Sequence, residues 1–184
     1  MENNLVRINK FLSESGYCSR READRLIDQG RVTINGVVPE MGTKISPTDE
    51  VRVNGELIKE KKDQHIYLAY NKPEGIECTT NLDVRDNIIE AINYPERIFP
   101  IGRLDKGSEG LIFMTNDGDI VNKILRARNN HEKEYVVTVN RTITDRFIDQ
   151  MSNGIPILDT ITRKCKVERI SNNVFRIVLT QGLN

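Results

Sequence analysis

A short apolar run bounded by turn residues constrains the fold of this chain more than any other feature. Leu111 to Met114 follow one another without a polar residue, and Asn116-Asp117-Gly118 after them is typical of a tight turn. A run of this length between turn signals predicts a buried strand. Loops anchored by such strands are common places for functional sites.

The loop before this run brings charges of opposite sign together. It reads Gly102-Arg103-Leu104-Asp105-Lys106. In an extended backbone Arg103 and Asp105 point to one side and Leu104 to the other. A guanidinium beside a carboxylate keeps the carboxylate ionised at neutral pH. We therefore expect Asp105 to act as a nucleophile, or to stabilise developing positive charge, rather than to act as a general acid.

Length and composition place the chain among cytoplasmic globular proteins. Its 184 residues can hold one mid-sized domain or two small ones. An apolar content of 38% and a charged content of 29% are typical of soluble proteins. No apolar run approaches the length of a membrane span, and the start Met-Glu-Asn-Asn lacks the features of a signal peptide.

Cysteines, histidines and net charge give no sign of a metal site or a strong electrostatic field. Cys18, Cys78 and Cys165 are far apart and contain no Cys-x-x-Cys pair. His65 and His131 have no partner at metal-ligand spacing. The formal net charge is zero, so any binding of nucleic acid has to depend on local basic patches.

Residues 1–62 read as a domain of two helices followed by a small antiparallel sheet. Ser19 with Glu22 three positions later predicts a capping box, and the two Asn-Gly pairs predict hairpin turns. The expected elements are a helix from Ile8 to Gly16, a helix from Ser19 to Gly30, a hairpin pairing 31–34 with 37–38, and a hairpin pairing 51–53 with 57–58.

The second of these helices carries a possible binding surface for RNA. Arg20 and Arg21 lie in its first turn, where the helix dipole disfavours cations. With Arg7, Lys10 and Arg25 they form a basic face suited to RNA phosphates. A solvated charged surface accounts for the pattern equally well, because acidic residues alternate with these cations.

Residues 63–184 read as a second domain, with the charge run at 59–63 as a linker. Strands are expected at 66–70, 110–115, 133–139, 164–170 and 174–180, and helices near 88–92, 118–125 and 144–153. Helices and strands mixed without regular alternation predict an α+β fold.

Four segments in chain order resemble the motifs of the pseudouridine synthases, specifically the ribosomal subfamily that modifies single uridines. They are the loop at 102–106 and the segments Lys72-Pro73-Glu74-Gly75, Lys133-Glu134-Tyr135-Val136-Val137 and Gln181-Gly182-Leu183-Asn184. The first domain resembles the RNA-binding S4 module of ribosomal small-subunit protein four, at Phe11-Leu12, 18–23, 30–32 and Asn35-Gly36. The resemblance implies an S4-like domain over 1–62 and a mixed-sheet catalytic domain, partial at its C-terminal end, over 63–184.

The resemblance implies that the chain isomerises uridine to pseudouridine with Asp105 as the catalytic residue. It places Tyr135 against the uracil, where the phenol helps to remove the ring proton, and Arg103 beside Asp105. Lys72 is expected to shape its turn rather than to do chemistry. The reaction oxidises, reduces and hydrolyses nothing, so we expect no metal and no cofactor.

The implied partner is RNA, in the first place large-subunit ribosomal RNA, with transfer RNA as a second candidate. We expect a monomer without a membrane partner. The residues expected to contact RNA are Arg20, Arg21, Arg25 and Arg31 in the first domain, and Arg103, Leu104, Lys106, Leu183 and Asn184 in the second.

The sequence leaves two other classes of protein open. One is an RNA-binding protein that keeps the synthase scaffold without catalysis. The other is a magnesium-dependent nuclease or phosphoryl-transfer protein, which would need a carboxylate cluster. The chain also stops at Asn184, inside the last motif, which in the family continues into a basic segment. For this form we therefore expect weak or no turnover.

Overall fold

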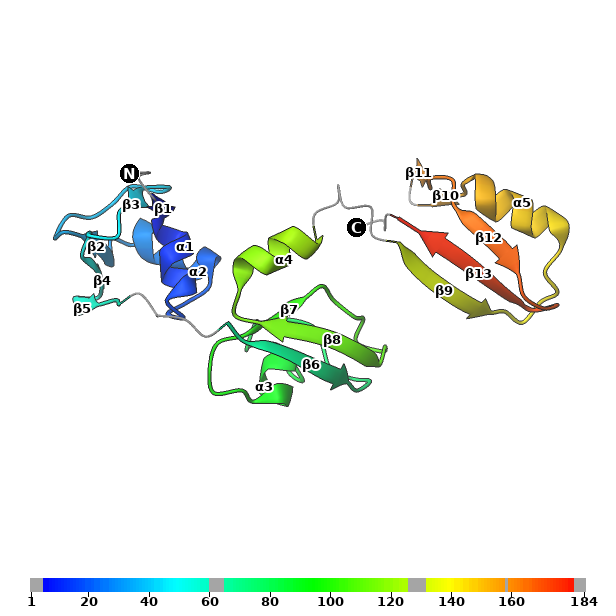
Figure 1. Cartoon of the computed structure of the whole chain (residues 1–184), viewed down its shortest axis with the longest axis horizontal. Coiled ribbons are helices and arrows are strands. Elements are labelled where there is room, and N and C mark those ends of the chain that lie inside the picture. The colour runs from blue at the N-terminus through cyan, green and yellow to red at the C-terminus, as the bar shows by residue number, and fades with distance from the viewer. Residues whose placement is uncertain (1–4, 60–64, 126–131, 158, 181–184) are drawn as a thin grey trace. The chain divides into compact units, whose positions relative to one another are not determined.

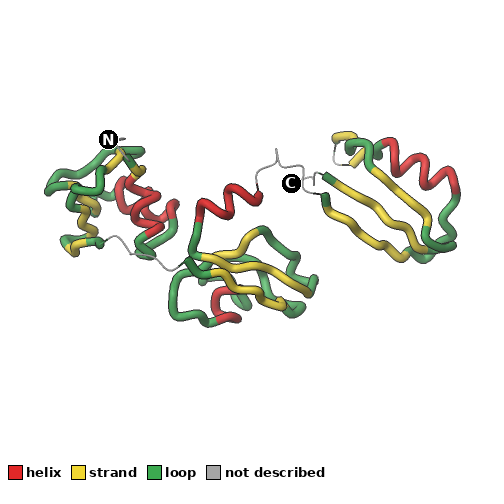
Figure 2. The backbone as a smooth tube through the Cα atoms, viewed as in Figure 1, coloured by secondary structure: helices red, strands yellow, loops and turns green. Residues whose placement is uncertain are grey.

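The computed structural model describes residues 5–59, 65–125, 132–157 and 159–180. The chain forms two compact units, residues 1–124 and 125–184, and the first contains two separate hydrophobic cores. Helices and antiparallel strand pairs alternate irregularly along the chain (Figures 1 and 2). The predicted α+β class is confirmed.

The part of the chain that contains the first core has two helices and five short strands. The elements are β1 (Val6–Arg7), α1 (Ile8–Glu14), α2 (Arg20–Asp28), β2 (Val32–Ile34), β3 (Lys44–Ile45), β4 (Val51–Val53) and β5 (Glu56–Leu57). Helix α2 begins where the sequence predicts, because the Ser19 side chain accepts a hydrogen bond from the Glu22 amide. The buried side chains are Ile8, Leu12, Ala23, Leu26, Ile27, Val32, Ile45, Val51 and Val53.

One of the two predicted hairpins in this part forms as expected, and the other is limited to its tight turn. Asn54-Gly55 connects β4 to β5, which pair with each other. Around Asn35-Gly36 only a single bridge forms, between Ile34 and Val37, and β2 pairs along its length with β4 instead. Val37 and Val38 are mostly exposed, so they gain little from strand pairing, and Pro39 after them has no N–H for a ladder.

The second core lies under a three-stranded antiparallel sheet with the order β6-β8-β7. The elements of this part are β6 (Tyr67–Lys72), α3 (Ile88–Ile92), β7 (Phe99–Ile101), β8 (Gly110–Thr115) and α4 (Gly118–Leu125). The buried apolar residues of this core are Ile88, Ile98, Ile112 and Met114, together with Cys78. An isolated parallel bridge joins Glu77 to Asn87.

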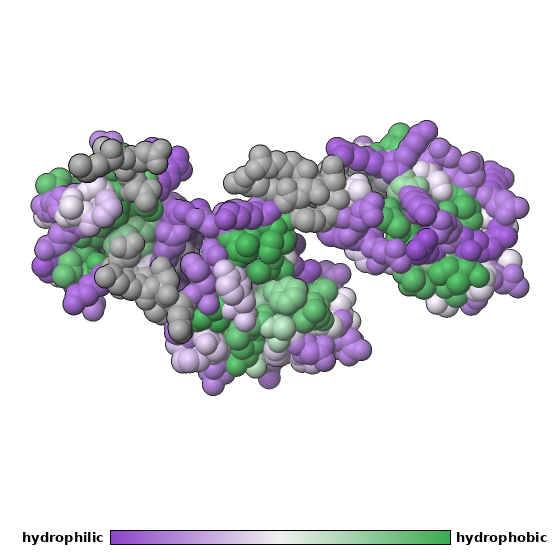
Figure 3. Space-filling model, in the orientation of Figure 1, coloured by the Kyte–Doolittle hydropathy of each residue, from purple (hydrophilic) through white to green (hydrophobic). Residues whose placement is uncertain are grey.

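Strand β8 corrects the expectation that its apolar run is buried throughout. Ile112 and Met114 face the core, whereas Leu111 is 61% and Phe113 52% exposed. Successive side chains of a strand alternate between the faces of a sheet, and only one face of this sheet is covered by the core. Apolar surface is visible over this part of the unit in Figure 3.

The second unit is a three-stranded antiparallel sheet packed against one helix. It contains β9 (Lys133–Thr138), α5 (Asp145–Asn153), β10 (Pro156–Ile157), β11 (Thr160–Ile161), β12 (Lys166–Arg169) and β13 (Val174–Leu179), and the sheet order is β12-β13-β9. Thr144 caps α5 as predicted, by accepting a hydrogen bond from the Phe147 amide. The Phe147 and Phe175 rings meet edge to face at 5.2 Å between centroids, which ties α5 to β13. None of the described helices is long and apolar enough to cross a membrane.

Asp117 caps the first turn of α4. Its Oδ1 accepts hydrogen bonds from the amides of Asp119 and Ile120, and its Oδ2 accepts one from the Tyr67 hydroxyl. Burial raises the pKa of Asp117, but these hydrogen bonds and the nearby His65 outweigh burial and hold the pKa below its usual range. The folded state therefore favours the ionised carboxylate.

We expect Asp117→Ala to lower the free energy of unfolding of the first unit by about 1 kcal/mol at pH 7, because α4 loses its cap. The pKa is lowered on folding, so this stabilisation is present above the unfolded value of about 4 and is lost as pH falls through the folded value. Urea unfolding of both proteins at pH 7 and in acid measures the difference. Equal stabilities at pH 7 would contradict the capping role.

Candidate active site

The loop that carries Asp105 joins β7 to β8 in the first unit. Gly102 begins it with a positive φ of 82°, a conformation that favours glycine. Arg103 and Asp105 are exposed, whereas Leu104 is half-buried and packs against the second core. The predicted alternation of these three side chains is therefore correct.

The predicted contact between Arg103 and Asp105 is not formed. No ion pair within 4.0 Å joins these two described side chains. Two residues on one side of an extended loop share a direction, but both are exposed, and their rotamers remain free. Among the described residues, no side chain pairs with the exposed Asp105 carboxylate.

Lys72 is completely buried at the end of β6, and its ammonium group is held by backbone carbonyls. Nζ donates to the carbonyl oxygens of Ile76 at 2.8 Å, Pro73 at 3.0 Å and Lys106 at 3.4 Å. A buried cation needs hydrogen-bond acceptors of this kind. The geometry agrees with the prediction that Lys72 shapes its turn, and it adds a link from that turn to the loop that carries Asp105.

Two backbone groups of the loop beside Asp105 are bonded to the segment 72–78. The Lys106 carbonyl accepts a hydrogen bond from the Gly75 amide at 2.8 Å, in addition to the one from Lys72. On the other side of Asp105, the Leu104 amide donates to Sγ of Cys78 at 3.4 Å. The loop backbone is thus fixed from beneath while the carboxylate stays exposed. Sequence reasoning missed Cys78, because no local pattern reveals a contact across 26 residues.

Three further residues predicted for the site, Tyr135 for catalysis and Leu183 and Asn184 for RNA contact, are outside the first unit. Tyr135 is on β9 in the second unit, opposite Ile177, with 47% of its surface exposed. Leu183 and Asn184 lie outside the described residues, as does the whole segment 181–184. The roles assigned to these residues stay predictions.

The arginines predicted to contact RNA are all exposed. Arg20 and Arg21 occupy the first turn of α2, and Arg25 on the same helix pairs with Glu22 at 3.0 Å. The side chain of Arg31 is fixed by the oxygens of Asn54 at 2.8 Å and Gln29 at 3.3 Å. The side chain of Lys106, on the Asp105 loop, is exposed as well.

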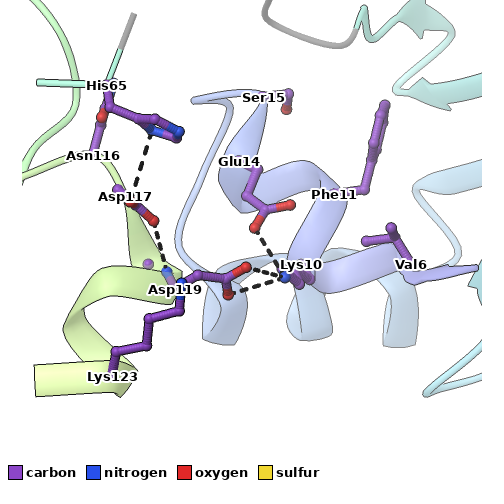
Figure 4. Close-up of a pocket in the computed structure, with 11 residues that line it drawn as sticks. Val6, Lys10, Phe11, Glu14, Ser15, His65, Asn116, Asp117, Asp119 and Lys123 are labelled. Carbon is purple, nitrogen blue, oxygen red and sulfur yellow. Dashed lines mark hydrogen bonds and ion pairs between the residues drawn. The ribbon is translucent and has the colours of Figure 1, made fainter. Parts of the chain in front are cut away.

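Lys10 does not belong to a free basic face. Its Nζ contacts both carboxylate oxygens of Asp119, at 2.8 and 3.0 Å, and Glu14 at 3.4 Å (Figure 4). The hydrogen bond to Asp119 raises the pKa of Lys10. These residues border a polar hollow of about 390 Å³ between α1 and the start of α4. Its lining is Val6, Lys10, Phe11, Glu14, Ser15, His65, Asn116, Asp117, Gly118, Asp119 and Lys123, none of which belongs to the Asp105 loop.

The fold and the loop define an α+β protein with an N-terminal RNA-binding S4 domain followed by a pseudouridine synthase fold. Residues 6–51 match the S4 domain model and residues 66–183 match the RNA pseudouridylate synthase model. The chain belongs to the RNA pseudouridylate synthase family. The two matches lie on either side of the predicted linker at 59–63, and the exact domain boundaries stay a prediction.

Relatives named as pseudouridine synthases and a solved structure agree with this assignment. The chain is 58% identical over 180 residues to the dual-specificity RNA pseudouridine synthase RluF of Shigella flexneri and of Salmonella typhi, covering 97% of this chain and 62% of each relative. It is 30% identical over 189 residues to ribosomal large subunit pseudouridine synthase B of Bacillus subtilis, covering 98% and 75%. A crystal structure of a pseudouridylate synthase matches with a TM-score of 0.59 and 26% identity, covering 97% and 79%. The chain spans about three fifths of the length of the RluF relatives.

Proposed function

We propose that this protein is an RNA pseudouridine synthase in which the carboxylate of Asp105 acts on the sugar of a uridine. The observation that carries the proposal is the exposed side chain of Asp105 on a loop with a fixed backbone. Hydrogen bonds hold the residue before Asp105 and the residue after it to the segment 72–78. Membership of the RNA pseudouridylate synthase family supports the reaction class. The proposed location is the cytoplasm, and the proposed form is a monomer without metal or cofactor.

The proposed substrates are large-subunit ribosomal RNA and transfer RNA. The RluF relatives are named for dual specificity on RNA, and the Bacillus relative is named for the ribosomal large subunit. The exposed arginines of the S4 domain would supply sequence-independent contacts to phosphates: Arg20, Arg21, Arg25 and Arg31. Lys106 would add a phosphate contact beside Asp105.

The reaction breaks the C1′–N1 bond of uridine, turns the uracil and forms a C1′–C5 bond. The proton on C5 leaves and N1 gains one, so the overall change is an isomerisation. Breaking a glycosidic bond develops positive charge on the sugar, which an ionised carboxylate stabilises or attacks. Asp105 serves either role, and Arg103 would help to hold the nucleotide.

The uridine has to leave its base stack before Asp105 can reach the sugar. Extrusion costs about a few kcal/mol, and stacking on an aromatic ring recovers roughly 1–3 kcal/mol. Tyr135 is half-exposed on its strand and is the proposed stacking partner. Its phenol is also proposed to help in removing the C5 proton.

Modification mapping tests this function in cells. In cells that lack the protein we expect one or more pseudouridines of large-subunit ribosomal RNA or transfer RNA to become uridine, and to return when the protein is expressed again. Mapping both RNA classes by the same chemistry identifies the substrate. Identical maps with and without the protein would refute the synthase assignment.

A further inference from the structure

The backbone on the N-terminal side of Asp105 is fixed by a cysteine that no motif singles out. Cys78 is 8% exposed and belongs to the second core, together with Ile88, Ile98, Ile112 and Met114. Its Sγ accepts the Leu104 amide at 3.4 Å, and the Leu104 side chain packs on the same core. Leu104 is therefore held through both its backbone and its side chain.

Hydrogen bonds hold the backbone directly before and directly after Asp105. Leu104 N is bonded to Cys78, and Lys106 O is bonded to Gly75 and Lys72. Only Asp105 lies between these two residues, and its own carbonyl accepts the Ser108 amide at 3.0 Å. The position of the Asp105 Cα atom is thus determined by bonds on either side of it.

We propose that Cys78 is a positioning residue for Asp105, which deepens the proposed synthase function and rests on it. The thiol touches no substrate; it sets the direction in which the carboxylate leaves the loop. Catalysis by a fixed carboxylate depends steeply on geometry, because small misplacements cost large factors in rate. A sulfur atom is suited to this buried position, because it accepts a hydrogen bond from an amide and also packs like an apolar atom.

Three variants separate positioning from general packing. Cys78→Ala removes the acceptor, Cys78→Ser replaces sulfur by another acceptor, and Ile88→Val removes a methylene group elsewhere in the same core. We expect Cys78→Ala to raise amide hydrogen exchange at Leu104 about tenfold. The Gly75 amide should keep its protection, because its partner is unchanged. Cys78→Ser should restore protection at Leu104, and Ile88→Val should leave it unaltered.

Turnover and binding of RNA give the second readout. We expect Cys78→Ala to lower kcat about tenfold with KM unchanged, and Cys78→Ser to recover most of kcat. A Cys78→Ala protein with unaltered Leu104 exchange or unaltered kcat would overturn the positioning role while the synthase function stands. If modification maps are identical in cells with and without the protein, the proposed function fails instead, and with it the positioning role.

Discussion

Asp105→Asn should abolish turnover and leave RNA binding intact. The amide has nearly the shape of the carboxylate but carries no charge, so it cannot stabilise a cationic sugar or attack it. We expect kcat to fall by a factor on the order of 10³ or more. Asp105 has no side-chain partner among the described residues, so the fold loses no ion pair or hydrogen bond by the change.

Release of tritium from RNA labelled at C5 of uridine measures this effect, because the reaction removes the C5 proton. Glu109→Gln is the matched control, since Glu109 is an exposed carboxylate on the same loop. The control should retain full turnover. An Asp105→Asn protein that still releases tritium would remove Asp105 from the reaction. If both proteins bind RNA, and cells that carry the Asp105→Asn variant give the same modification map as cells that carry the unsubstituted protein, the non-catalytic RNA-binding alternative is favoured.

Lys72→Met should destabilise the first unit by about 3 kcal/mol. Methionine fills a similar volume but donates nothing, so the carbonyls of Pro73 and Ile76 lose their bonds to the buried ammonium. Removing a buried charge gives back part of its desolvation cost. Because the carbonyls left behind are also desolvated, we expect the loss of hydrogen bonds to exceed that gain.

Chemical denaturation of Lys72→Met and of a matched Lys106→Met variant measures the effect. The Lys106 side chain is exposed, and the bonds at this residue are made by its backbone carbonyl, so its replacement should change stability by less than about 0.5 kcal/mol. Similar stabilities for the two variants would show that the buried ammonium contributes little to the fold.

Local signals predicted much of the fold, and pairings between distant segments were the weak point. Ser19 and Thr144 mark helix starts because a capping side chain bonds an amide three residues later. The partner of β2 could not be read in this way. Strand β2 pairs with β4 rather than with residues 37–38 because Val51 and Val53 of β4 are buried in the core. That burial depends on the assembled core and not on local sequence.

At the candidate site, too, local sequence predicted some features and missed those that depend on distant contacts. Alternation along the loop predicted that Leu104 points away from its two charged neighbours, and in the structure Arg103 and Asp105 are exposed while Leu104 is half-buried against the core. The ion pair was wrong, because a shared direction does not fix the distance between two solvated side chains. Cys78 was missed, because its contact appears only once β6, β7 and β8 have packed together.

The way Lys72 is bound has a consequence for how this region can evolve. Every acceptor of its ammonium group is a main-chain oxygen, at positions 73, 76 and 106. Almost any amino acid at those positions presents the same oxygen, so mutations there leave the anchor itself in place. Of the residues that form this anchor, only Lys72 has to keep its side chain.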